Sequence, residues 1–127
     1  MLDKSVDELS SLYMSRQWAP NLVVIESPFA SPDPDEWLRF RHYTTRAVRD
    51  SFSRGEFPFA SHLMYPGALD DDSSTERWLG MNAGFSWGRF ANLVAVYTDL
   101  GISSGMARGI QEATRRGQLI DYREIGV

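Results

Sequence analysis

The sequence predicts an α/β fold with a mainly parallel sheet of about four to five strands and helices on both faces. Strand-like and helix-like segments alternate along the chain, which is typical of parallel strands joined by crossover helices. The longest apolar stretches are 22–25 and 90–97, as expected for strands covered on both faces. With 127 residues, the chain is long enough for one domain with a real core and too short for two.

An N-terminal helix or arm, residues 1–20, is expected to precede the α/β domain at 21–127. Residues 5–16 carry apolar side chains at helical spacing, and the sequence Trp18-Ala19-Pro20 is expected to end this helix. The arm is therefore interpreted as an addition to the domain and not as part of its sheet.

The first strand is predicted at 22–26, because its sequence, LVVIE, is short, apolar and rich in β-branched residues. A proline-rich loop follows, and Asp33-Pro34 is a typical start for a helix, here ended by Gly55. Helices are expected at 34–54, 74–89 and 105–116, and further strands at 57–65, 90–98 and 118–124. Together these segments alternate as in a parallel sheet.

The composition excludes several classes of function. The chain has no cysteine, and its two histidines do not have the spacing of a metal site, so neither a metal nor another cofactor is expected. A net charge of −4 argues against a nucleic-acid polymer as partner, because such binding depends on neutralising phosphates. No apolar run approaches the ~20 residues of a membrane span and no secretory signal is visible. The expected location is therefore the cytoplasm.

The first candidate site element follows the first strand. Ser27, Pro28 and Phe29 begin a loop at the carboxyl edge of the sheet, where open α/β sheets bind ligands. Glu26 ends the strand, and a carboxylate there is unfavourable unless it meets a partner or faces a pocket. Two alternatives stay open: the turn has only a structural role, or Glu26 pairs with an arginine such as Arg46 or Arg108.

The second element is the turn that enters the helix at 105–116. Ser103, Ser104 and Gly105 lead into Met106, and a helix N-terminus with flanking hydroxyls can bind a phosphate or another anion. The alternative is a serine that only caps the helix.

The acidic segment before the helix at 74–89 is the third element. Its aspartates, Asp72 among them, could hold a sugar hydroxyl or a cation, or form a solvated turn that caps the helix. Asn82 is a polar residue among apolar neighbours and is a candidate ligand-binding residue, as is His62. Four aromatic side chains are candidates for stacking on a base: Phe29, Phe59, Tyr65 and Trp87.

The motifs SPFA, PFASHL, ERWLG and GISSGM, in this order, resemble small bacterial and phage proteins of unassigned function related to the nucleoside 2-deoxyribosyltransferases. That superfamily also includes nucleotide N-glycosidases. The resemblance covers residues 22–123. It implies a flavodoxin-like (Rossmann-like) three-layer fold, a homodimer or larger homo-oligomer, and a pocket for a small nucleotide or nucleoside.

The resemblance also assigns roles by position. Ser103 matches a serine that contacts the 5′-phosphate, and Gly105 and Met106 match the turn and the start of the helix. The nucleophilic glutamate of the enzymes falls on Gly109, and their sugar-binding aspartate falls near Gly84. Both acidic positions are therefore glycine in this chain.

Other acids could replace the missing carboxylates, and Glu26, Asp72 and Glu112 are the candidates. Three functions consequently stay open. The protein is an enzyme of the N-glycosidic bond with rearranged acids, a binder of a nucleotide-derived ligand without catalysis, or an oligomeric interaction protein.

Overall fold

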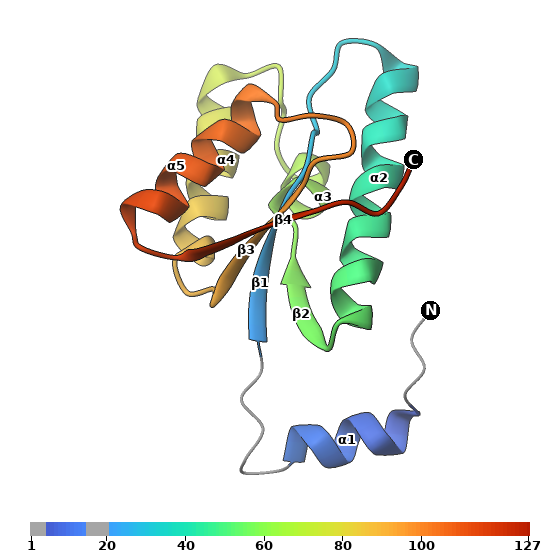
Figure 1. The fold of residues 1–127 in the computed structure, drawn as a ribbon. Helices are drawn as coiled ribbons and strands as arrows, with labels where there is room; N and C mark the ends of the chain where they lie inside the picture. The colour runs from blue at the N-terminus through green and yellow to red at the C-terminus, as the bar shows by residue number, and fades with distance from the viewer. Residues whose placement is uncertain (1–4, 15–20) are drawn as a thin grey trace.

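A computed structural model describes residues 5–14 and 21–127 and confirms the predicted fold class. Its four strands are all parallel and lie in the order β2-β1-β3-β4. Their bounds are β1 Asn21–Glu26, β2 Glu56–Phe59, β3 Leu93–Tyr97 and β4 Leu119–Arg123. Helices cover both faces of the sheet, which gives the expected three-layer, flavodoxin-like architecture (Figure 1).

Each face of the sheet has its own apolar core. On one face, Val23 and Ile25 of β1 pack with Tyr43 and Ala47 of α2 (Pro34–Ser53). On the other face, Val94 and Val96 of β3 pack with Met106 and Ala113 of α5 (Ser104–Arg115). Successive strand residues point to opposite faces. Burial of both faces thus explains why β1 and β3 are continuous apolar runs in the sequence.

Local signals at the ends of α2 act as the sequence predicts. The carboxylate of Asp33 accepts a hydrogen bond from the backbone N–H of Asp35 and caps the helix, with Pro34 as its first residue. Gly55 follows the last turn with a φ of 80°, a left-handed conformation that favours glycine. These two signals fix the length of the crossover between β1 and β2.

The prediction of a strand over 57–65 is wrong in its second half. Strand β2 ends at Phe59, and the chain then forms the short helix α3 (Ser61–Met64) and the 3₁₀ turn η1 (Tyr65–Gly67). Short apolar runs do not distinguish strand from helix, and the segment after Phe59 contains no β-branched residue. The turn into α3 brings His62 beside the end of β1.

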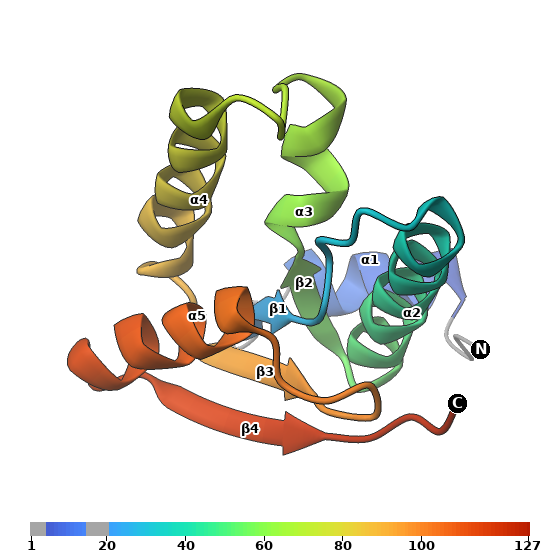
Figure 2. The same cartoon turned by 90° about the horizontal axis from the view of Figure 1, so that it is seen from above.

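Helix α4 (Ser74–Gly88) lies on the same side of the sheet as α5 (Figures 1 and 2). Apolar residues occur all around it, and Gly88 is its only buried residue. Trp78 and Trp87 are both more than 60% exposed. Helix α4 is therefore not packed into a core like that of α2 or α5, and this leaves space between α4 and the sheet.

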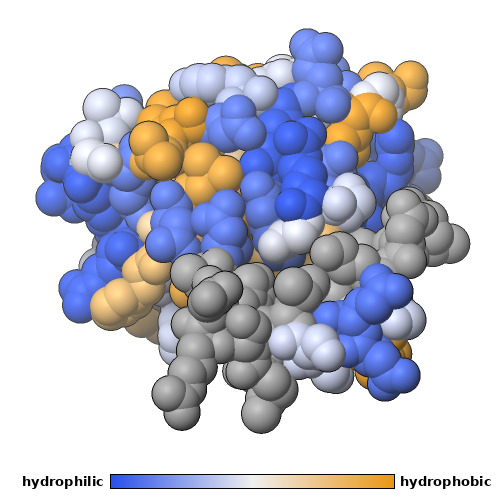
Figure 3. Space-filling view, turned by 60° about the horizontal axis from the view of Figure 1, so that its bottom comes forward, coloured by the Kyte–Doolittle hydropathy of each residue, from blue (hydrophilic) through white to orange (hydrophobic). Residues whose placement is uncertain are grey.

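The expected N-terminal helix is present as α1 (Val6–Met14), apart from the sheet in Figure 1. Its predicted end at Trp18-Ala19-Pro20 lies outside the described residues. Among the described residues, no helix is long and apolar enough to cross a membrane. On the face that Figure 3 shows, hydrophilic side chains separate the apolar patches.

Candidate functional site

A cavity of about 750 Å³ opens between α4, α5 and the sheet. Strands β1 and β3 lie next to each other, but the chain leaves them in opposite directions, to β2 on one side and to β4 on the other. Loops diverge at such a switch point, which is where open α/β sheets bind ligands. The cavity therefore lies where the sequence predicted a site.

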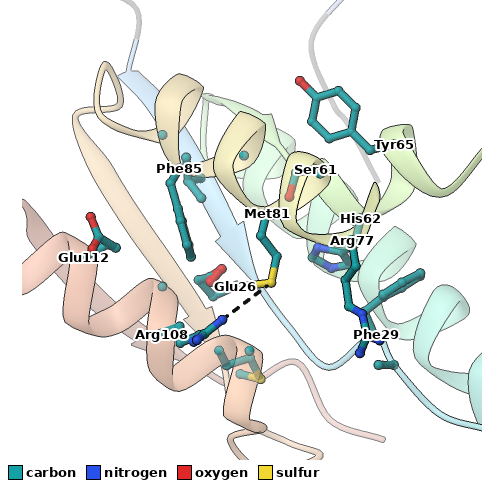
Figure 4. A pocket seen from close by; sticks show the side chains of 18 of the residues that line it. Glu26, Phe29, Ser61, His62, Tyr65, Arg77, Met81, Phe85, Arg108 and Glu112 are labelled. Atoms are coloured by element: carbon teal, nitrogen blue, oxygen red, sulfur yellow. Dashed lines mark hydrogen bonds between the residues drawn. The ribbon is translucent and has the colours of Figure 1, made fainter. Parts of the chain in front are cut away.

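Glu26 is the last residue of β1 and lines the cavity. Its Oε2 atom is buried and has no hydrogen-bond partner. Burial raises the pKa of this carboxyl from 4.5 to about 8, so it is protonated at neutral pH. Neither arginine suggested as its partner pairs with it. Arg46 donates to the carbonyl oxygen of Ile125, and Arg108 donates to the sulfur of Met81 (Figure 4).

His62 belongs to a cluster of neutral polar side chains that follows Glu26 at the end of β1. The hydroxyl of Ser27 lies 2.8 Å from Nε2 of His62 and 2.6 Å from the hydroxyl of Thr44. Thr44 in turn donates to the carbonyl oxygen of Phe40. Burial lowers the pKa of His62 from 6.5 to about 4, so the imidazole is neutral at physiological pH. The ring of Phe29 packs against it at a centroid distance of 5.6 Å. The Ser27 hydroxyl is thus already engaged within the protein.

Two arginines line the cavity from opposite helices, Arg77 from α4 and Arg108 from α5. No described carboxylate forms an ion pair with either of them. Figure 4 shows both arginines in the cavity wall that also contains Glu26 and His62. Sequence patterns did not indicate that these two residues form a site. Arg77 lies inside the motif ERWLG and Arg108 lies two residues after GISSGM, and this position is the signal that could have found them.

The N-terminus of α5 also faces the cavity. The hydroxyl of Ser103 accepts a hydrogen bond from the backbone N–H of Met106 and caps the helix, so the capping alternative describes its side chain. Ser104 and Gly105 are exposed and line the cavity with Ser103. The positive end of the helix dipole therefore points at the same space as Arg108.

Several predicted site residues lie elsewhere. Pro28, Asp72, Asn82 and Trp87 are not part of the cavity lining. The Asp72 backbone N–H donates to the carboxylate of Asp70 in a solvated turn, and the Asn82 amide donates to the Trp78 carbonyl on its own helix. The physical reason is local hydrogen bonding, which holds these polar groups within their own segment.

Glu112 does line the cavity, but it forms ion pairs with Arg115 at 2.6 Å and with Arg116 at 3.4 Å. The hydrogen bond from Arg115 lowers its pKa, so it is ionised at neutral pH. Two of the carboxyl groups that line the cavity are therefore in opposite states, Glu26 neutral and Glu112 charged. Such a split is typical of acid and base roles in one site.

At Gly84 and Gly109, a side chain would be accommodated only if a neighbouring side chain moved. A Cβ at Gly84 would lie 2.8 Å from the hydroxyl of Ser61, so glycine permits the contact between α4 and α3. A Cβ at Gly109 would overlap the carboxyl group of Glu26.

Among the described residues, no group of three metal-ligating side chains is present.

A protein-family model, described as a domain of unknown function (DUF7768), matches residues 21–123. The chain belongs to the DUF7768 family. The match runs from the first residue of β1 to the last residue of β4, so the DUF7768 domain contains every element that lines the cavity. No curated protein and no solved structure matches the chain. The homo-oligomer and the cytoplasmic location stay predictions.

The pKa of Glu26 predicts how the stability of this DUF7768 domain depends on pH. Because folding raises this pKa from 4.5 to about 8, the stability from its bound proton is fully present below pH 4.5 and is lost as the pH rises to 8. His62 acts in the opposite sense, but only between pH 6.5 and 4. From pH 6.5 to 8 we expect a loss of about 2 kcal/mol in the free energy of unfolding.

Urea unfolding at pH 6.5 and pH 8 measures this loss in the wild type and in Glu26→Gln. The glutamine variant cannot ionise at this position, so we expect its stability to stay nearly constant over the same range. An equal loss in both proteins would contradict the burial of the Glu26 carboxyl.

Proposed function

We propose that this protein binds a small nucleotide or nucleoside in the cavity and hydrolyses its N-glycosidic bond. The observation that carries the proposal is the protonated Glu26 carboxyl, with an oxygen that has no protein partner, on a cavity of about 750 Å³. Small-molecule sites have volumes of about 300–1,000 Å³. A buried polar atom without a partner is unfavourable, and a ligand that bonds to it removes this cost.

The remaining cavity wall is suited to the rest of such a ligand. Arg77, Arg108 and the N-terminus of α5 offer positive charge for a phosphate. Apolar and aromatic side chains, Phe29, Tyr65 and Phe85 among them, offer surfaces for a base. This combination of charged and aromatic groups supports a nucleotide over an uncharged or purely apolar ligand.

Glu26 supports a complete hydrolytic cycle. The carboxylic acid donates its proton to a ring nitrogen of the base while the bond from C1′ to the glycosidic nitrogen breaks and its electron pair stays with the base. The resulting carboxylate stabilises the positive charge that develops on the sugar. A water molecule then bonds to C1′ and returns its proton to Glu26. The products are the free base and the sugar, or its phosphate.

Binding without catalysis is the second candidate. The observation that favours it is the state of Glu112, whose carboxylate forms ion pairs with two arginines. Among the described cavity residues on β1 and α5, Glu26 is therefore the only carboxyl group without a partner. In the enzymes that the sequence resembles, two acids contribute. A single acid is sufficient for recognition of a base but leaves the activation of water to the same group.

The two candidates are separated by incubating the purified protein with ribo- and deoxynucleoside monophosphates and analysing the products by chromatography with mass detection. Hydrolysis gives free base in proportion to the amount of protein. Intact nucleotides together with saturable binding in calorimetry would refute hydrolysis and support binding without catalysis. The absence of both binding and turnover across the panel would refute the proposal.

Replacing Arg77 and Arg108 together with glutamine is expected to weaken binding of a nucleoside monophosphate by about 10- to 100-fold, because each loses a charge-assisted hydrogen bond to phosphate. Binding of the matching nucleoside, which has no phosphate, is expected to change less than about threefold. Isothermal titration calorimetry measures both. The matched control is Arg39→Gln, an exposed arginine on α2, which lies on the other face of the sheet. Equal weakening of nucleotide and nucleoside would contradict a phosphate site at these arginines.

A further inference from the structure

We propose that Gly109 is a positioning residue for Glu26: the missing side chain at 109 is what allows a carboxyl from strand β1 to occupy this point of the cavity. Residue 109 of α5 and residue 26 of β1 thus compete for one position, and an acid can be delivered there from either element but not from both. The inference deepens the proposed function. Only its test by base release rests on that function, whereas the tests by stability and by pKa do not.

The geometry is specific to this pair. A Cβ built on Gly109 would lie 2.6 Å from Oε1 of Glu26 and closer still to Oε2 and the carboxyl carbon. Atoms of real side chains do not approach so closely, so any other residue at 109 displaces the carboxyl of Glu26. No other atom is among the three nearest to this Cβ. The space that Gly109 leaves is therefore filled by the Glu26 carboxyl group.

Neither backbone conformation nor helix stability accounts for a glycine at position 109. Gly109 is not among the glycines with a positive φ, so its backbone accepts alanine. Glycine is the least favourable residue in a helix interior after proline, and Gly109 lies in the middle of α5. The nearby Gly105 shows the contrast, since a Cβ there would meet only the Ser103 hydroxyl at 3.9 Å. At Gly109, by contrast, the three nearest atoms all belong to the Glu26 carboxyl group, so this carboxyl accounts for the glycine.

The displaced group is the end of a flexible side chain, so a substitution at 109 moves Glu26 and leaves the backbone in place. The charged or titratable groups that line the cavity with it are Arg108, Glu112 and Arg116 on α5, Glu76 and Arg77 on α4, His62 on α3, and Tyr65 and Asp71 between α3 and α4. None of them contributes to the raised pKa of Glu26, whose cause is burial. Moving the carboxyl toward solvent consequently lowers its pKa from about 8 toward 4.5.

The first test is a thermal-unfolding cycle of the full chain at pH 6.5, with the wild type, Gly109→Ala, Glu26→Ala and the double variant. Gly109→Ala is expected to leave Tm unchanged or lower it in the wild type. In the Glu26→Ala background it is expected to raise Tm by about 4 °C, because the clash is absent and alanine favours the helix. Gly105→Ala is the control on the same helix, with the same shift in both backgrounds. Equal shifts from Gly109→Ala in both backgrounds would overturn the proposal.

A titration by NMR measures the pKa of Glu26, which a change in helix stability alone does not alter. We expect its pKa to fall by at least one pH unit in Gly109→Ala and to stay near its wild-type value in Gly105→Ala. An unchanged pKa in Gly109→Ala would also overturn the proposal.

The last test asks whether the acid can be supplied from α5. Glu26→Ala is expected to lose base release. Adding Gly109→Asp or Gly109→Glu to this variant is expected to raise its rate of base release at least tenfold. If neither substitution raises the rate of base release, the proposal that residue 109 can supply the acid in place of Glu26 is overturned.

Failure of the inference and failure of the proposed function give different results. A coupled Tm cycle and a shifted pKa without any base release leave the pairing of Gly109 with Glu26 intact and refute hydrolysis. Base release together with an uncoupled cycle refutes the pairing and leaves hydrolysis intact.

Discussion

Replacing Glu26 with glutamine is expected to slow release of the free base by about 10²- to 10⁴-fold, the usual effect of removing a general acid. Glutamine has the shape of the protonated carboxyl but cannot give up a proton or become an anion beside the sugar. Since Glu26 is protonated at neutral pH, the variant keeps the neutral state of the cavity, and its KM is expected to change little. Initial rates at saturating nucleotide measure the loss.

The matched control is Glu36→Gln, an exposed acid in the first turn of α2, on the other face of the sheet. Its rate is expected to equal that of the wild type. Glu112→Gln distinguishes Glu26 from the cavity carboxyl group on α5, because Glu112 is ionised and already ion-paired. A larger loss in Glu112→Gln than in Glu26→Gln would transfer the acid role to α5 and contradict the assignment to β1.

The pH profile follows from the same assignment. The donor is active only when protonated, so the rate is expected to fall as the pH rises through about 8. A rate that instead rises over this range would indicate that the ionised form of Glu26 acts, as a nucleophile or as a general base.

Much of the fold could be predicted because its signals are local. The apolar runs of β1 and β3 indicated buried parallel strands, and Asp33-Pro34 and Gly55 marked the ends of α2 within a residue or two. The topology then placed the loops after β1 and β3 at one edge of the sheet, so the location of the cavity followed from the chain order alone.

The composition of the site could be predicted only in part, because it depends on contacts between distant segments. The charge and the polarity of Glu26 were visible in the sequence, but its lack of a partner was not. The contact with Gly109 joins β1 to α5 across most of the chain, and no periodicity reports such a contact. Gly109 therefore suggested a lost acid in the sequence, whereas in the structure it lies against an acid that β1 supplies.

Ser27 and His62 were both predicted as site residues, but their hydrogen-bonded cluster with Thr44 was missed for a second reason. Its geometry depends on α3, a single short helix in a segment predicted as strand. A local error of a few residues in secondary structure thus concealed a contact between two residues that the sequence had already indicated.

Away from the cavity, a buried ion pair on the α2 side joins the two edge strands. Two nitrogens of Arg123, in β4, donate to the two carboxylate oxygens of Glu56, in β2, at 2.7 and 2.8 Å. Ser51 of α2 also donates to Glu56, and both members of the pair are less than 10% exposed. Burial alone would raise the pKa of Glu56, but the hydrogen bonds from Arg123 and Ser51 lower it, so this carboxylate is charged in the folded state.

Replacing Arg123 with methionine is expected to lower the free energy of unfolding by about 3–5 kcal/mol, because it leaves the Glu56 carboxylate buried without its charge partner. Urea unfolding at pH 7 measures the change. Since a lowered pKa adds stability only above its unfolded value of 4.5, the difference between the variant and the wild type is expected to narrow as the pH falls below 4.5.

The control for this prediction is Arg54→Met, which breaks a partly exposed ion pair with Asp50 and is expected to change stability by less than about 1 kcal/mol. The double variant Arg123→Met/Glu56→Leu removes both charges, and we expect it to recover most of the loss, since apolar residues of similar size often replace a buried pair without penalty. A double variant as unstable as Arg123→Met alone would mean that the loss arises from packing at β4 and not from the uncompensated charge of Glu56.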